Sequence, residues 1–126
     1  MNHILVVALG GAVGAAGRHL VGMSALRLFG TNFPWGTLTV NFVGSFLMGV
    51  LIETLALKGN VGQEVRLFLA TGVLGGFTTF SAFSLDAVLL FDRKGAGLAA
   101  LYVGASVMLS VLALFAGLKL MRVILG

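Results

Sequence analysis

Four long apolar runs, separated by short polar connections, make up most of the 126-residue chain. The runs cover about residues 4–26, 37–57, 65–91 and 97–118. Each approaches or exceeds the roughly 20 residues that a helix needs to cross about 30 Å of hydrocarbon. We therefore expect an all-α integral membrane protein with four transmembrane helices, forming a single membrane domain over residues 1–126.

The composition agrees with this expectation and excludes a water-soluble domain. Hydrophobic residues make up 59% of the chain and charged residues 10%, whereas soluble domains average about 25% charged residues. The sequence has no cysteine, so disulfides are excluded. AVGAAG (residues 12–17) resembles the small-residue cleavage site of a signal peptide. No Lys or Arg precedes it, and we expect a retained helix instead.

The positive charges are nearly balanced between the two expected membrane surfaces. The net charge is +4, and we assign it to anchoring at lipid head groups rather than to nucleic-acid binding, since the charges are scattered singly. The side of the termini carries Lys58, Arg66, Lys119 and Arg122, and the other side carries Arg27, Arg93, Lys94 and, depending on its direction, Arg18. Orientation requires an excess of Lys and Arg on one side. We therefore expect an antiparallel, dual-topology homodimer, while a single orientation imposed by a partner remains open.

Glycines recur in the first two runs at spacings that suit close helix packing. Gly10, Gly14 and Gly17 lie in the first run, and Gly44 and Gly49 lie in the second. Small residues at such spacings allow the backbones of two membrane helices to approach closely. We expect these glycines to have a structural role.

The stretch GGFTTFSAF, residues 75–83, interrupts the third apolar run. Gly75 and Gly76 disfavour a helix, and the following threonines favour extended backbone, which predicts a third helix broken near its middle. Non-helical backbone at membrane depth is tolerated only inside protein or along a cavity. Its freed carbonyls could bind a small cation. The ring edges of Phe80 and Phe83 could stabilise a small anion, although ordinary packing is the alternative.

Other polar residues within the runs each have a structural and a functional interpretation. Asn41 could form an interhelical hydrogen bond or face a pore. Arg18 could cap carbonyls, snorkel to the interface or attract anions into a vestibule. Tyr102, Ser106 and Ser110 recur every four residues, so their hydroxyls form a ladder along one stripe. The serines could instead bond the carbonyls four residues earlier in their own helix.

Two motifs together resemble the Fluc, or CrcB, family of small fluoride channels. They are GTLTVNFVG (residues 36–44) and GGFTTFSAFS (residues 75–84), and the resemblance covers essentially the whole chain. It implies a passive fluoride-selective channel of the bacterial inner (plasma) membrane. In that family the chains form an antiparallel homodimer with two pores and a central, structural sodium ion.

The resemblance also implies roles for particular residues. The expected fluoride pathway consists of Asn41, Phe80, Ser81, Phe83, Tyr102, Ser106 and Ser110. Arg18 matches an arginine of the first span, with a vestibular or structural role. The backbone carbonyls of Gly75 and Thr78 match those that hold the sodium ion. The chain departs from the family pattern at Ala82 and Leu114, where threonine is usual, so the path loses hydroxyls there.

Three other classes of function fit the sequence less well. A small multidrug-resistance-like, proton-coupled exporter also pairs four-span chains antiparallel, but it needs a carboxylate deep in the first span, which has none. Glu53 and Asp86, the carboxylates within spans, lie toward span ends. A purely structural subunit would not need a broken span or a hydroxyl ladder. No nucleophile and base are spaced for enzyme catalysis, and a His/Cys metal site is not expected.

Overall fold

The computed structural model describes residues 2–59 and 61–126, and its regular elements there are all helical. In chain order the elements are α1 (His3–Phe29), α2 (Trp35–Lys58), α3 (Gln63–Arg66), η1 (Leu67–Leu74), α4 (Gly75–Phe77), α5 (Phe80–Lys94) and α6 (Ala96–Leu125). Four segments are long and apolar enough to cross a membrane: α1, α2, the composite segment Gln63–Lys94, and α6. The expectation of an all-α chain with four membrane-crossing segments is confirmed.

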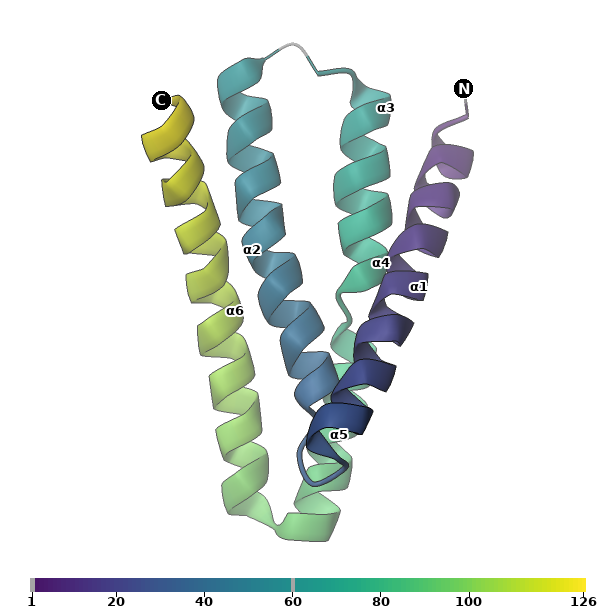
Figure 1. The fold of residues 1–126 in the computed structure, drawn as a ribbon, viewed down its shortest axis with the longest axis vertical. Helices are drawn as coiled ribbons and strands as arrows, with labels where there is room; N and C mark the ends of the chain where they lie inside the picture. Colours follow the sequence, from purple (N-terminus) through teal and green to yellow (C-terminus); the bar gives the residue numbers. More distant parts are fainter. Residues whose placement is uncertain (1, 60) are drawn as a thin grey trace.

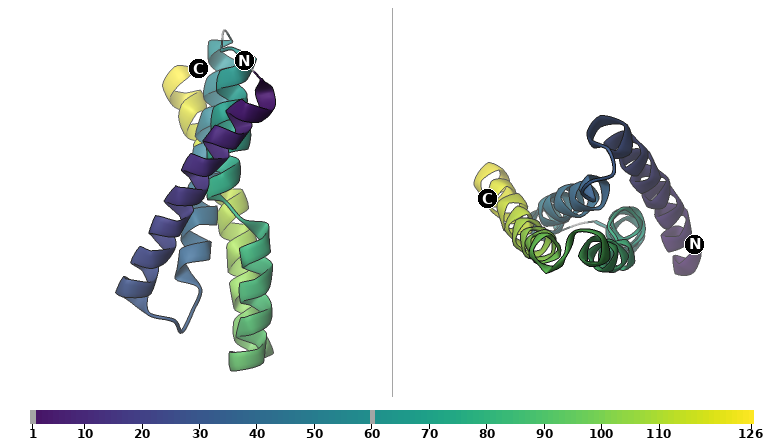
Figure 2. Two further views of the ribbon diagram at one scale, coloured as in Figure 1. Left: turned by 90° about the vertical axis from the view of Figure 1, so that its right-hand side faces the viewer. Right: turned by 90° about the horizontal axis from the view of Figure 1, so that it is seen from below.

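The four segments run up and down between two ends of the molecule (Figure 1). The N-terminus, the C-terminus and the connection from α2 to α3 lie at one end, and the α1–α2 loop and the α5–α6 turn lie at the other. The main packing pairs are α2 with α6 and α1 with η1 and α4. Seen from below, α1 lies apart from α6, with the other segments between them (Figure 2). Both termini therefore share one side, as the even number of spans predicts.

Glycines bring these paired helices into backbone contact. A Cβ atom on Gly10 of α1 would lie 2.9 Å from the Cα atom of Gly72 in η1. A Cβ atom on Gly49 of α2 would lie 3.0 Å from the backbone nitrogen of Leu118 in α6, and one on Gly117 of α6 would lie 2.8 Å from the nitrogen of Val50. Real Cβ atoms do not fit at such distances. The predicted packing role of Gly10 and Gly49 is confirmed.

The third membrane-crossing segment changes its backbone conformation twice. Residues Leu67–Leu74 are wound as a π-helix, for which the sequence pattern gives no signal. Thr78 (φ −83°, ψ 159°) and Thr79 (φ −154°, ψ 125°) are then extended, between the end of α4 and the start of α5.

The non-helical residues are the two threonines and not the two glycines. Gly75 and Gly76 remain helical in α4. A Cβ atom on Gly76 would lie 2.6 Å from the carbonyl oxygen of Gly11 in α1, so this glycine allows close contact between helices instead of breaking one. The prediction that Gly75 and Gly76 would interrupt the helix was therefore wrong for both glycines.

The fourth segment is longer than the hydropathy pattern indicates, because α6 continues to Leu125. Its last turns carry Lys119 and Arg122, which lower the local hydropathy. The Nη2 atom of Arg122 lies 3.1 Å from the Oε1 atom of Glu53, whose side chain is only 11% exposed. This ion pair joins the ends of α2 and α6 and keeps the charged turn in contact with the bundle.

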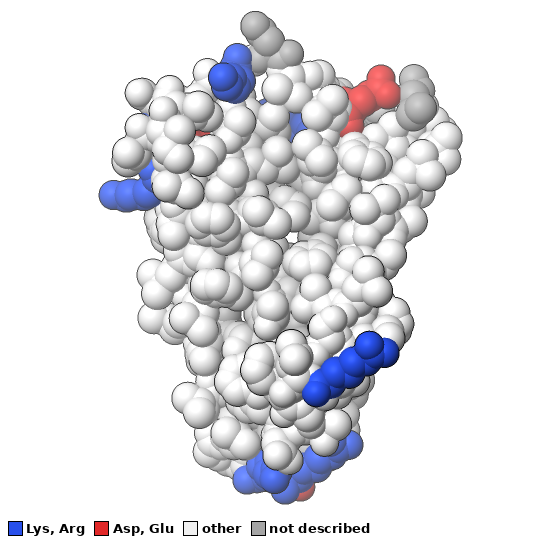
Figure 3. Space-filling model, viewed as in Figure 1, with Lys and Arg blue, Asp and Glu red and all other residues white. Residues whose placement is uncertain are grey.

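One small cluster of packed core residues lies toward the end that carries the α5–α6 turn. Tyr102, which is fully buried, packs with Leu38 and Leu90, and Phe33 and Phe83 adjoin them. Many large apolar side chains are instead exposed on the outer faces of the helices. On the face shown in Figure 3, the charged residues lie toward the two ends, with an uncharged band between them. This distribution suits a surface that contacts hydrocarbon in the middle and head groups at both ends.

Candidate functional site

A cavity of about 270 Å³ lies beside the two extended threonines. Its lining residues come from α2, the α4–α5 junction, α5 and α6: Asn41, Ser45, Thr78, Thr79, Phe80, Phe83, Ser106, Val107 and Ser110. We call this space the hydroxyl-lined cavity. It brings together five of the seven residues that the resemblance places on the fluoride pathway. Tyr102 and Ser81 are the two that do not line it.

The hydroxyl groups of α6 are buried and unpaired. Within the described residues, the hydroxyl oxygens of Tyr102, Ser106 and Ser110 are shielded from solvent and have no partner at hydrogen-bond distance, although the Tyr102 hydroxyl lies near those of Thr37 and Ser106 and near the Asp86 carboxylate. Two threonines behave differently, because Thr54 donates to the carbonyl of Val50 at 2.7 Å and Thr78 donates to that of Leu74 at 3.0 Å. The two serines therefore do not bond the carbonyls four residues before them. A buried hydroxyl without a partner carries a free-energy cost of about 1–3 kcal/mol, and such a group needs an explanation beyond packing.

Three aromatic rings form a chain from the surface to the core. The ring centroids of Phe80 and Phe83 lie 5.6 Å apart with planes tilted by 48°. Phe83 in turn lies 5.3 Å from the ring of Tyr102. Phe83 is half-buried, whereas Phe80 is 78% exposed and projects from the chain. Tyr102 therefore supports the ring of Phe83 from the core, beneath the hydroxyl-lined cavity.

Asn41 of α2 bonds both backbone groups of Thr79. Its Nδ2 atom donates to the Thr79 carbonyl at 3.0 Å, and its Oδ1 atom accepts from the Thr79 N–H at 2.8 Å. Thr79 is extended, so its backbone groups lack helical hydrogen-bond partners, and Asn41 supplies a partner for each of them. The interhelical hydrogen bond expected as one alternative is present, and the side chain also lines the hydroxyl-lined cavity.

Thr79 begins α5 as its N-cap. The Oγ1 atom accepts the N–H of Ala82 at 3.1 Å and lies 3.3 Å from the Oγ atom of Ser81. A threonine in this position satisfies one of the free N–H groups of a helix start. The cap holds the first turn of α5, which carries Phe80 and Phe83. Ser81 is exposed and does not line the hydroxyl-lined cavity.

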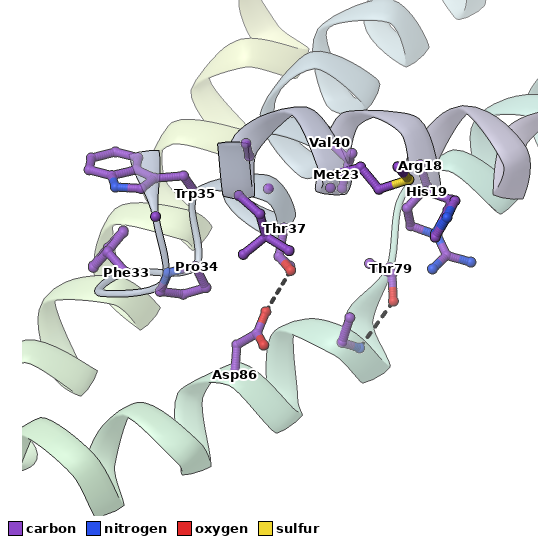
Figure 4. Close-up of a pocket in the computed structure, with 16 residues that line it drawn as sticks. Arg18, His19, Met23, Phe33, Pro34, Trp35, Thr37, Val40, Thr79 and Asp86 are labelled. Carbon is purple, nitrogen blue, oxygen red and sulfur yellow. Dashed lines mark hydrogen bonds between the residues drawn. The ribbon is translucent and has the colours of Figure 1, made fainter. Parts of the chain in front are cut away.

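A second cavity, of about 400 Å³, opens on the other side of α5. We call it the Arg18 cavity, and Figure 4 shows the side chains that line it. Thr37 of α2 donates to the Oδ2 atom of Asp86 at 2.5 Å across this space. Arg18 and His19 of α1 face it near Thr79.

The sequence reasoning did not include Thr37 or Asp86 among the site residues. The sequence contains a signal for each of them. Thr37 lies within the first motif, and Asp86 follows Phe83 by three positions on the same helix. Ala82, where the family pattern has threonine, lines the Arg18 cavity and not the hydroxyl-lined one. A hydroxyl at position 82 would therefore belong to the Arg18 cavity.

Arg18 reaches the end of α4 from the neighbouring helix. Its Nε atom donates to the carbonyl of Gly76 at 3.1 Å. A cation at the C-terminal end of a helix is favourable, because the last carbonyls carry partial negative charge. The capping bond expected as one interpretation of Arg18 is present in the structure, and the residue also lines the Arg18 cavity.

The carbonyls of Gly75 and Thr78 are available to a cation. In a continuous helix they would accept the N–H groups of Thr79 and Ala82. Those N–H groups are instead donated to the Oδ1 atom of Asn41 and the Oγ1 atom of Thr79. Neutral oxygen atoms without donors are ligands suited to a small hard cation. The residues present therefore fit a sodium ion.

Comparison with known proteins agrees with the residues assembled here. Residues 5–118 match the family described as CrcB-like protein, Camphor Resistance (CrcB). A protein of Agrobacterium fabrum named fluoride-specific ion channel FluC is 60% identical over 122 residues, covering 97% of this chain and 98% of that protein. A protein of the same name from Chelativorans sp. is 58% identical over 125 residues, covering 99% of this chain and 100% of the relative.

A third relative comes from Cereibacter sphaeroides and is also named fluoride-specific ion channel FluC. It is 59% identical over 122 residues, which cover 97% of this chain and 96% of that protein. Identity of this degree extends over nearly the full length of each of these proteins. The chain therefore belongs to the CrcB family.

Proposed function

We propose that this protein is a passive, fluoride-selective ion channel that spans the plasma membrane several times and lets fluoride leave the cytoplasm. The observation that carries the proposal is the hydroxyl-lined cavity, where the buried, unpaired hydroxyls of Ser106 and Ser110 face Phe80 and Phe83. Four membrane-crossing segments and relatives named fluoride-specific ion channels support the same function.

The chemistry of this cavity suits fluoride. Fluoride is small and strongly hydrated, so a path through hydrocarbon must replace water with other hydrogen-bond donors. Ser106 and Ser110 have O–H groups that no protein acceptor occupies, and the edges of Phe80 and Phe83 carry partial positive charge. The residues lining the cavity carry no fixed positive charge. Conduction requires binding weak enough to release the ion, and such neutral donors provide it.

The complete channel is an antiparallel homodimer with a pore on each side of its two-fold axis. A single chain leaves the ring of Phe80 78% exposed. It also leaves the carbonyl of Gly75, an exposed residue, without its helical donor. Lipid cannot satisfy such a carbonyl, and a second copy facing the same junction would cover it. The nearly equal numbers of Lys and Arg at the two ends agree with copies inserted in opposite orientations.

The carbonyls of Gly75 and Thr78 from both chains would hold a structural sodium ion. When bound, the ion would supply positive charge that links the two chains and offsets the negative end of the helical segment before the extended threonines. It would be part of the scaffold and would not be transported.

The alternative, a proton-coupled exporter resembling small multidrug-resistance proteins, has less support. Such an exporter needs a titratable carboxylate deep in the first span, and His3–Phe29 contains no Asp or Glu. Asp86 borders a cavity but is hydrogen-bonded to Thr37.

The proposed function is tested by ion efflux from liposomes that contain the purified protein. We expect rapid fluoride efflux down its gradient once a potassium ionophore lets K⁺ follow and so prevents a membrane potential from opposing the efflux. Chloride efflux in parallel vesicles should stay near that of empty liposomes. Equal efflux of both anions would contradict selectivity. Fluoride efflux that requires a proton gradient would instead support the exporter.

A further inference from the structure

Four carbonyls around the extended threonines, those of Gly75, Gly76, Thr78 and Thr79, fall into two groups. Those of Gly76 and Thr79 accept hydrogen bonds from side chains of neighbouring helices, Arg18 and Asn41. Those of Gly75 and Thr78 have lost their helical donors to other acceptors. Each carbonyl bonded by a side chain therefore comes one residue after one that is free for a cation.

The hydrogen bonds of Asn41 determine the direction of the Thr78 carbonyl. The Oδ1 atom of Asn41 accepts the Thr79 N–H at 2.8 Å, and this N–H belongs to the same planar peptide group as the Thr78 carbonyl. In a trans peptide the N–H and the C=O point in opposite directions, and the described chain has no cis peptide. The Thr78 carbonyl therefore points away from Asn41.

Arg18 bonds the peptide group that follows the one containing the Gly75 carbonyl. Its Nε atom, 3.1 Å from the Gly76 oxygen, restrains the peptide group that joins Gly76 to Phe77. It comes from α1, which packs against α4 through the contact of Gly76 with Gly11. Two side chains on different helices thus hold three peptide groups at the junction: Arg18 bonds one and Asn41 bonds two.

We propose that Arg18 and Asn41 are the positioning residues of the cation site. They occupy the Gly76 and Thr79 carbonyls and thereby leave those of Gly75 and Thr78 for the ion. This inference rests on the proposed structural sodium ion. It also gives Asn41 a role besides contact with fluoride, because the carbonyl group and one N–H of its side-chain amide are engaged by Thr79.

The test measures thermal unfolding of the purified dimer while sodium replaces N-methylglucamine at constant ionic strength. Wild type should melt at higher temperature as sodium rises, since a ligand that binds only the folded state stabilises it. Asn41→Ala, Asn41→Ser and Arg18→Lys should move the midpoint of this sodium titration at least about tenfold higher. Arg18→Lys keeps the positive charge, so a shift there reflects the lost hydrogen bond and not the charge.

Gly49→Ala is the matched control, because it disturbs α2 at a contact with α6 away from the junction. It should lower the melting temperature at every sodium concentration without moving the midpoint. A variant that forms a dimer only at high sodium would support the proposal.

Two results would overturn the positioning role. One is an unchanged midpoint in the Asn41 and Arg18 variants when wild type responds to sodium. The other is a variant that fails to form a dimer even at saturating sodium, since that residue would then be needed for the fold itself. A wild-type melting temperature that ignores sodium would instead remove the proposed cation site. Fluoride efflux tests the channel separately.

Discussion

Individual hydroxyl groups in this protein differ in whether they have a hydrogen-bond partner. Thr54 and Thr78 bond carbonyls of their own helical segments, which is the ordinary solution in a membrane helix. Ser106 and Ser110 line the hydroxyl-lined cavity. Their hydroxyl oxygens are shielded from solvent and form no such bond within the described residues. The chain therefore keeps these donors free, at a cost in stability, in the cavity that we propose for fluoride.

Removal of one of these hydroxyls should separate stability from function. We expect Ser106→Ala or Ser110→Ala to reduce fluoride efflux from liposomes by about tenfold, or about 1.4 kcal/mol in the barrier. The melting temperature should stay equal or rise, because an unpaired buried hydroxyl costs about 1–3 kcal/mol.

Thr54→Val provides the control for this comparison. Its hydroxyl is already bonded to Val50 and lies outside both cavities. We expect fluoride efflux to remain at the wild-type rate in this variant. A loss of stability in Ser106→Ala or Ser110→Ala together with normal efflux would show that the serines serve packing.

The phenylalanine rings are tested by a change that keeps their apolar bulk. Phe80→Ile and Phe83→Ile should each lower fluoride efflux by at least about tenfold, since isoleucine has no ring edge with partial positive charge. Volume and hydrophobicity are nearly preserved, so dimers should persist on size-exclusion chromatography. Normal efflux from dimeric Ile variants at both positions would leave the family assignment intact and reject the ring-edge mechanism.

At the scale of helices, the packing of α2 on α6 places the two walls of the hydroxyl-lined cavity. Asn41 and Ser45 belong to α2, and Ser106 and Ser110 belong to α6. The helices approach through Gly49 and Gly117, beyond the cavity along both helices. The spacing of the donors across the cavity therefore depends on contacts that are not part of it.

Gly49→Ala should destabilise this packing. The added Cβ atom would meet the carbonyl of Leu114 and lie 3.0 Å from the nitrogen of Leu118, and backbone atoms cannot move aside as a side chain can. Overpacking of this kind costs about 1–3 kcal/mol. The measurement is the thermal or denaturant unfolding of the purified protein.

Gly104→Ala on α6 is the matched comparison, because a Cβ atom there meets nothing within 4 Å. Alanine is favoured over glycine within a helix by about 1 kcal/mol, so this variant should be as stable as wild type or more stable. Equal stability of the two variants would mean that the α2–α6 contact tolerates a larger separation.

At the scale of the whole molecule, the distribution of charge leaves orientation in the membrane undecided. Arg18 bonds Gly76 at the level of the third segment's interruption, so it belongs to neither membrane surface. Four positive residues then remain at the end with the termini and three at the other. A difference of one is a weak determinant of topology.

Reporter fusions at the C-terminus should therefore be active on both sides of the membrane. A pair of reporters, one active only in the cytoplasm and one only outside it, measures the two populations. Replacement of Thr31 and Asn32 in the α1–α2 loop by lysine should shift the population toward chains with that loop in the cytoplasm. A wild-type chain detected on one side alone would contradict the antiparallel dimer.

The chain alone determines that four helices cross a membrane, because segment length and hydrophobicity decide insertion without reference to any particular contact. The close approach of α1 and α2 to their neighbours can also be predicted from the sequence, since glycines such as Gly10 and Gly49 occur at the points of contact. The hydroxyl ladder follows from the fixed geometry of one helix, in which residues four apart share a face. Each of these features depends on local sequence.

Tertiary structure decides the rest, because these features depend on which helix lies next to which. Gly76 stays helical since it faces the backbone of Gly11, and Thr79 is extended in a form that Asn41, 38 residues away, satisfies with two hydrogen bonds. The bond between Thr37 and Asp86 likewise joins residues 49 positions apart. No sequence pattern predicts that a hydroxyl such as that of Ser106 lacks a hydrogen-bond partner, because this depends on all the groups packed around it.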